Sequence, residues 1–142
     1  MTAQIIDGRA IARIVRSEVK QRTAVLATRG VVPGLKVILA GDDPASQIYV
    51  RSKQRMAEKC GIAAETIRLP ATLSPAQLLE HIQLYNRDPE VDGILVQLPL
   101  PSHIPAGIQA EILGQIDPAK DVDGLHPLNL GRLLAGEEGF VA

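Results

Sequence analysis

The 142-residue sequence has few aromatic residues, a single cysteine and almost no net charge. Its aromatic residues are Tyr49, Tyr85 and Phe140, so the core must be aliphatic, and the stacking platforms that bind single-stranded nucleic acid are disfavoured. The lone Cys60 excludes a disulfide framework and a CxxC redox or zinc motif. The 15 basic and 16 acidic residues give a net charge of −1, which provides no general field to attract polyanions.

Long apolar runs are also missing. The longest, Gly93 to Pro101, is too short to span a bilayer, and the polar N-terminal residues do not resemble a signal peptide. We therefore expect a cytoplasmic protein that binds neither a membrane nor nucleic acid. The three histidines, His81, His103 and His126, are widely separated in the sequence, and we expect no bound metal.

The remaining pattern is typical of an α/β fold. Short apolar runs at 35–40, 62–69 and 94–98 predict buried strands. Helical periodicity with capping and proline signals predicts helices at 7–30, 43–61, 74–85, 105–116 and 128–134. Strands and helices that alternate in this way form a three-layer domain, in which helices flank a mostly parallel sheet. We expect one domain over residues 1–142, cut from a longer chain.

Open parallel sheets bind ligands at the carboxyl ends of their strands, and two polar residues of the second predicted helix lie near that edge. Tyr49 and Lys53 are four residues apart and therefore share one helix face. Spacing alone favours a lysine that extends past a half-buried tyrosine into solvent. The functional alternative is a lysine that acts as a general acid or base.

Two further segments reach the same edge. Gln97 ends an otherwise apolar strand, so its amide either satisfies a neighbouring loop or reaches into a site. Asp121 and Asp123 form an acidic turn, which is either solvated or accepts hydrogen bonds from an amidine-like ligand edge. The segment 41–46 is similar to a phosphate-binding loop but lacks the GxxxxGK[ST] and GxGxxG patterns, so it predicts no nucleotide site.

Three segments together resemble the N-terminal half of the bifunctional methylenetetrahydrofolate dehydrogenase/methenyltetrahydrofolate cyclohydrolase family. They are GDDPASQIYVRSK at 41–53, GILVQLPLP at 93–101 and KDVDGLHPLNLGRL at 120–133. The sequence NRD at 86–88 also fits the family pattern, and the likeness extends in order through essentially the whole chain.

The resemblance implies roles for individual residues. Lys53 matches the catalytic lysine of the family, and Gln97 matches the glutamine that hydrogen-bonds this lysine. Asp123 matches the aspartate of the catalytic set that holds the pterin ring, and Tyr49 matches the tyrosine that lies on the aminobenzoate ring of the substrate. Backbone groups would line the same cleft at Val96, Leu98 and Pro99.

The resemblance also implies two reactions of one-carbon metabolism, which supports purine, methionine and histidine biosynthesis. The first is the NADP-dependent oxidation of 5,10-methylenetetrahydrofolate to 5,10-methenyltetrahydrofolate, and the second is hydrolysis of that product to 10-formyltetrahydrofolate. Family members bind NADP mainly through a C-terminal Rossmann domain that this chain does not include, and they form homodimers. We therefore expect the chain to carry the folate-side residues, to hold no cofactor site and to lack dehydrogenase activity by itself.

Two other hypotheses stay open at this point. In one, the chain binds folate but does not turn it over. In the other, it is an unrelated α/β interaction domain with a basic helix. Binding of a tetrahydrofolate analogue separates the last hypothesis from the first two, and a cyclohydrolase assay separates the enzyme from the folate-binding domain.

Overall fold

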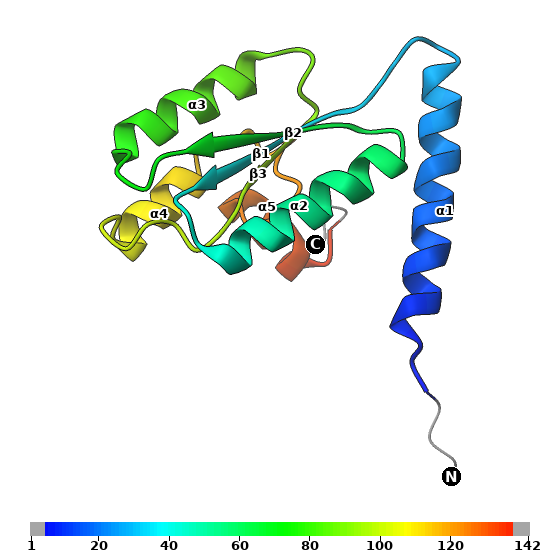
Figure 1. Ribbon diagram of the computed structural model, residues 1–142, viewed down its shortest axis with the longest axis horizontal. Helices are drawn as coiled ribbons and strands as arrows, with labels where there is room; N and C mark the ends of the chain where they lie inside the picture. Colours follow the sequence, from blue (N-terminus) through cyan, green and yellow to red (C-terminus); the bar gives the residue numbers. More distant parts are fainter. Residues whose placement is uncertain (1–4, 138–142) are drawn as a thin grey trace.

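The computed structural model describes residues 5–137, so Phe140 lies outside the described residues. The three strands are β1 (Gly34–Ala40), β2 (Ala63–Leu69) and β3 (Gly93–Val96). The helices are α1 (Gly8–Ala27), α2 (Pro44–Lys59), α3 (Pro75–Arg87), α4 (Ala106–Leu113) and α5 (Pro127–Ala135). All strands run parallel in the order β2-β1-β3 (Figure 1), which confirms the predicted α/β class.

Local signals explain where the helices begin. Asp43 caps α2, because its carboxylate accepts a hydrogen bond from the Ser46 amide at 2.7 Å. Ser74 and Gln77 form the predicted capping box of α3. A proline occupies the start of each of α2, α3 and α5, where a missing N–H costs nothing.

Two elements end earlier than predicted. β3 ends at Val96 rather than at Leu98, although the Gln97 amide still donates to the Ile38 carbonyl at 2.9 Å. Pro99 follows Gln97 by two residues and has no N–H to donate to a neighbouring strand, so the strand cannot continue. α4 ends at Leu113 rather than at Ile116, with a glycine at its C-cap.

The sheet separates two apolar clusters. On one face, Val37 and Leu39 of β1 pack with Val50 of α2 and Leu95 of β3. Alternate strand residues point to opposite faces, so the residues between these form the larger cluster beneath α3 and α4. The strand members of that cluster are Ile38, Ala40, Ile94 and Val96. The three predicted layers are therefore present.

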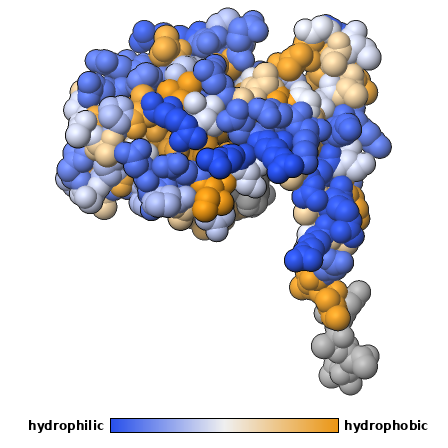
Figure 2. All heavy atoms as spheres, in the orientation of Figure 1, coloured by the Kyte–Doolittle hydropathy of each residue, from blue (hydrophilic) through white to orange (hydrophobic). Residues whose placement is uncertain are grey.

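α1 stands apart from the layered body (Figure 1). Thr23 is the one buried residue of this helix, and its hydroxyl donates to the Cys60 carbonyl at the end of α2. Six apolar residues predicted the helix correctly, and four of them remain about half exposed; Figure 2 shows apolar atoms at the surface along α1. The four are Ile11, Ile14, Val15 and Val25, whereas Val19 and Leu26 are partly buried.

A segment beyond the last strand lies beside β3. Asp121 pairs with Ile94 in a single parallel bridge, and the Ile94 amide donates to the Lys120 carbonyl at 2.7 Å. The Lys120 ammonium donates to three carbonyls at the end of α3, where a cation complements the helix dipole. These bonds fix the acidic turn that follows against the sheet.

We expect Gly34→Ala to destabilise the protein by about 1–3 kcal/mol, because an added methyl group would overlap a neighbouring backbone. A Cβ at Gly34 would lie 1.9 Å from the carbonyl oxygen of Glu90, and two hydrogen bonds between Gly34 and Asp92 hold these chains together. Urea unfolding measures the effect. Gly107→Ala in α4, where a Cβ meets no atom within 4 Å, is the control and should be neutral or stabilising. Equal stability of the Gly34 variant and the unaltered protein would show that the loop before β3 moves freely.

Candidate functional site

Lys53 and Gln97 meet at the carboxyl end of β3. Lys53 follows the buried Val50 by three residues on α2 and therefore faces the sheet. Gln97 follows Leu95 by two residues, which places its side chain on the α2 side of the sheet. The Lys53 ammonium donates to Gln97 Oε1 at 3.1 Å, while Gln97 Nε2 donates to the Leu98 carbonyl at 2.7 Å. The amide therefore both orients the lysine and secures its own loop.

Asp123 lies within electrostatic reach of this pair. Partial burial raises the pKa of Asp123, the Lys53 ammonium lowers it, and the Asp121 carboxylate raises it, so that the pKa is above the ordinary value. Within residues 5–137 the Asp123 carboxylate accepts no hydrogen bond from the protein. A half-buried carboxylate with free acceptor positions is suited to a ligand that presents N–H donors.

The other predicted residues surround this centre with different exposure. Tyr49 lies one helical turn before Lys53, and 64% of its surface is exposed, so its ring is free to stack. The side chain of Val96 is buried, which leaves only its backbone for contact. Leu98 is partly exposed and joined by a cis peptide bond to Pro99, which lines a cavity of about 460 Å³ at the carboxyl ends of β1 and β3.

Asp121 differs from both interpretations of the acidic turn. Its exposed surface is 2%, and its Oδ2 atom accepts hydrogen bonds from the His126 amide at 2.8 Å and from Asn129 Nδ2 at 2.9 Å. It is therefore neither solvated nor available to a ligand. Sequence reasoning did not identify Asn129, although a polar residue between Leu128 and Leu130 was a detectable signal.

The β1–α2 junction does not form a phosphate site. The Asp43 carboxylate already occupies the N-terminus of α2, and hydrogen bonds from Ser46 lower the pKa of that carboxyl group. A phosphate would meet this negative charge. The GxGxxG pattern of dinucleotide-binding turns is absent from residues 5–137. In the same residues, no group of three histidine, cysteine or acidic side chains is arranged to hold a metal ion.

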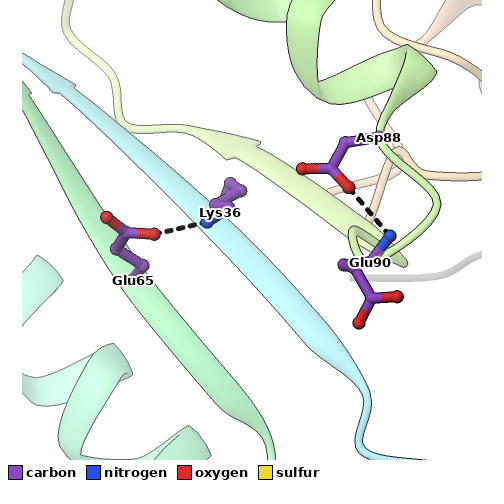
Figure 3. Close-up of polar contacts among 4 residues, drawn as sticks. All are labelled: Lys36, Glu65, Asp88 and Glu90. Carbon is purple, nitrogen blue, oxygen red and sulfur yellow. Dashed lines mark hydrogen bonds and ion pairs between the residues drawn. The ribbon is translucent and has the colours of Figure 1, made fainter.

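The opposite edge of the sheet holds another lysine, in a different environment (Figure 3). Lys36 of β1 forms an ion pair with Glu65 of β2, and that bond raises the pKa of Lys36. Figure 3 also shows the Asp88 carboxylate accepting from the Glu90 amide, so it is used within its own turn. A lysine whose ammonium group is held by a carboxylate gives up its proton less readily, and only the deprotonated amine can accept one. Lys53 instead hydrogen-bonds a neutral amide and is free of a carboxylate ion pair in the described residues, so the carboxyl edge is the better candidate for acid–base chemistry.

The chain is similar to a known protein family over most of its length. Residues 6–123 match the family described as tetrahydrofolate dehydrogenase/cyclohydrolase, catalytic domain. Bifunctional protein FolD of Dichelobacter nodosus is 55% identical over 138 residues, which are 96% of this chain and 46% of that protein. The chain thus spans about half the length of the curated relatives it matches.

No helix among residues 5–137 is both long enough and apolar enough to cross a membrane.

Solved structures with the same fold include one from a bacterium and one from a protozoan. The bifunctional FolD methylenetetrahydrofolate dehydrogenase/cyclohydrolase of Campylobacter jejuni has a TM-score of 0.90 at 44% identity, and the match covers 94% of this chain and 47% of that one. The Trypanosoma brucei enzyme, solved with NADP cofactor and an inhibitor, has a TM-score of 0.89 at 36% identity. That match covers 100% of this chain and 48% of the other.

Proposed function

The chain belongs to the tetrahydrofolate dehydrogenase/cyclohydrolase family, and on that basis we propose that it binds a reduced folate at the carboxyl edge of its sheet and hydrolyses 5,10-methenyltetrahydrofolate to 10-formyltetrahydrofolate. The hydrogen bond from Lys53 to Gln97 is the observation that supports this proposal most directly. It holds an amine beside a half-buried carboxylate, next to an exposed aromatic ring.

The hydrolysis requires removal of a proton from the attacking water and delivery of a proton to the departing nitrogen. Methenyltetrahydrofolate is a cation, and water adds to its bridging carbon with loss of one proton, which gives a neutral carbinolamine. The bond from that carbon to one ring nitrogen then breaks and the departing nitrogen takes up a proton. The hydroxyl group loses its own proton to solvent as it becomes the formyl carbonyl, so that one proton is released overall. One amine performs both transfers when it accepts the first proton and delivers the second. We assign this role to Lys53, with Gln97 as the group that orients it.

The remaining residues bind the substrate. The Asp123 carboxylate accepts hydrogen bonds from the N–H groups of the pterin ring, and the Tyr49 ring stacks on the aminobenzoate ring. Backbone groups of Val96, Leu98 and Pro99 contact the substrate beside these residues. Residues 1–142 then constitute the folate-binding catalytic domain.

The curated relatives are about twice as long as this chain, so the activity of a protein of that length is a second part of the proposal. We propose that the full-length protein is a cytoplasmic homodimer that also oxidises 5,10-methylenetetrahydrofolate with NADP. The folate contacts are the contribution of this chain to that reaction.

Two measurements on the purified protein test the proposal. Calorimetric titration with a tetrahydrofolate analogue should show saturable binding at one site per chain. A cyclohydrolase assay should then show turnover of the methenyl substrate above the rate in buffer. Binding without turnover would indicate a folate-binding domain, and absence of binding would indicate an interaction domain of another kind.

We expect Tyr49→Ala to weaken folate binding by about two- to tenfold, because stacking of aromatic rings contributes roughly 0.5–1.5 kcal/mol beyond the area that it buries. Tyr49→Phe keeps the ring and should bind nearly as well as the unaltered protein. Titration of both variants with the same analogue compares them. Equal losses in the two variants would assign the contact to the hydroxyl group instead.

A further inference from the structure

Asp121 and Asn129 form a buried pair beneath the turn that carries Asp123. The exposed surface is 2% for Asp121 and 1% for Asn129. Asn129 Nδ2 donates to Asp121 Oδ2 and to the Pro118 carbonyl, both at 2.9 Å. The same Asp121 oxygen accepts from the His126 amide at 2.8 Å. We call Asp121 and Asn129 the buried clamp.

The chemistry of the clamp explains why one partner is an amide. Asp121 Oδ2 and the Pro118 carbonyl are both acceptors, so the group between them must donate twice. The NH₂ group of Asn129 does so, at the expense of its Oδ1 atom, which is buried without a hydrogen-bond partner in the described part of the chain. A carboxylate at position 129 would place oxygen against oxygen. The arrangement therefore specifies both the residue type and the orientation of its amide.

The clamp holds both ends of the turn. At one end, Asp121 is bridged to Ile94 of β3. At the other end, His126 caps α5 by accepting the Leu128 amide on Nδ1, and its Nε2 lies 3.1 Å from the Gly114 carbonyl. Asp123 lies between these fixed ends, and its carboxylate has no hydrogen bond of its own to the described protein. Its position is therefore set by the backbone of the turn.

We propose that Asp121 and Asn129 are positioning residues for folate binding, which act by holding the Asp123 carboxylate in the direction of the pterin ring without touching the substrate. The inference rests on the proposed function of Asp123. It assigns a task to two buried residues that are otherwise unexplained. The Lys53–Gln97 pair lies on other elements, so loss of the clamp should impair binding more than the chemical step.

The test compares four variants in folate titration and in cyclohydrolase kinetics. Asp121→Ala and Asn129→Ala should each raise Kd and KM by about tenfold, the effect of losing a hydrogen bond to a charged group, with kcat changed by less than about threefold. Asp121→Asn retains an acceptor oxygen and should recover most of the affinity. Asp117→Asn is the matched control: among residues 5–137 its carboxylate accepts a hydrogen bond only from the Ala119 amide of the same loop, and the KM of this variant should stay within about twofold. Thermal melting confirms that each variant is folded under assay conditions.

A double-variant experiment distinguishes positioning from a general loss of stability. In an Asp123→Asn background, Asp121→Ala should add less than about twofold to Kd, because the group that it positions is already altered. Full additivity would overturn the inference, as would a loss in Asp121→Asn as large as in Asp121→Ala, or a fall in kcat at unchanged KM. Failure of the unaltered protein to bind the analogue would overturn the proposed function itself, together with this inference.

Discussion

Lys53→Met should lower the cyclohydrolase rate by at least about a hundredfold, because general acid–base catalysis contributes roughly 10²- to 10⁴-fold. Methionine keeps an apolar stem of similar length and removes only the amine. In the structure that amine donates to Gln97, and its charge acts on Asp123. The expected result is a fall in kcat with folate affinity largely retained. Single-turnover measurement of methenyl hydrolysis gives the rate directly.

The control for this variant is another lysine of the same helix. Lys59→Met changes the last residue of α2, which is exposed, and should leave the rate within about twofold. In a longer form of the protein that also has dehydrogenase activity, Lys53→Met should reduce that activity much less, because oxidation at the methylene carbon needs no proton transfer there. Equal losses of both activities in a folded variant would show that Lys53 positions the substrate for both reactions instead.

Asp123→Asn should weaken folate binding by about 10- to 150-fold, because hydrogen bonds to a charged group contribute roughly 1.5–3 kcal/mol. The carboxylate accepts from several donors at once, whereas an amide replaces one acceptor oxygen with a competing donor. Calorimetric titration at neutral pH measures the loss. Unchanged affinity would remove Asp123 from the site, whatever happens to the stability of the protein.

The same substitution should stabilise the folded protein at neutral pH. Burial raises the pKa of Asp123, so the folded protein binds a proton here more tightly than the unfolded chain does. The unaltered protein therefore loses stability as pH rises from the ordinary carboxyl value through the raised pKa, and the asparagine variant does not. The difference in free energy of unfolding should grow across that interval and then stay constant. A variant less stable than the unaltered protein at neutral pH would mean that the carboxylate makes a stabilising contact.

Local sequence signals predicted most of the fold. Asp43 before Pro44, and Ser74 three residues before Gln77, mark helix starts through bonds within one turn, so no tertiary information is needed to find them. Gln97 was recognisable for a similar reason, because one polar residue at the end of an apolar run must find a partner. Its partner in the structure is Lys53, which is also the residue that the family resemblance implies.

The features that sequence reasoning missed depend on contacts between distant segments. The sequence placed Asp121 in a turn that is either solvated or binds a ligand, and only its bridge to Ile94 and its bond to Asn129 show that it is internal. The apolar stripe of α1 predicted the helix correctly, but periodicity does not specify which surface covers a stripe. In residues 5–137 that stripe remains largely in water, with Thr23 as the point of attachment.

The exposed stripe of α1 has a consequence for the heat capacity of unfolding. The positive heat-capacity change comes from apolar surface that unfolding newly brings into water. Ile11, Ile14 and Val25 are already about half hydrated in the folded protein, so melting α1 adds less to this change than melting the sheet and its covering helices. The helix is therefore held mainly by its own backbone hydrogen bonds and by its attachment at Cys60. Such an element opens at lower free energy than the sheet, and the cooperative unit that resists heat is the layered body that carries Lys53 and Asp123.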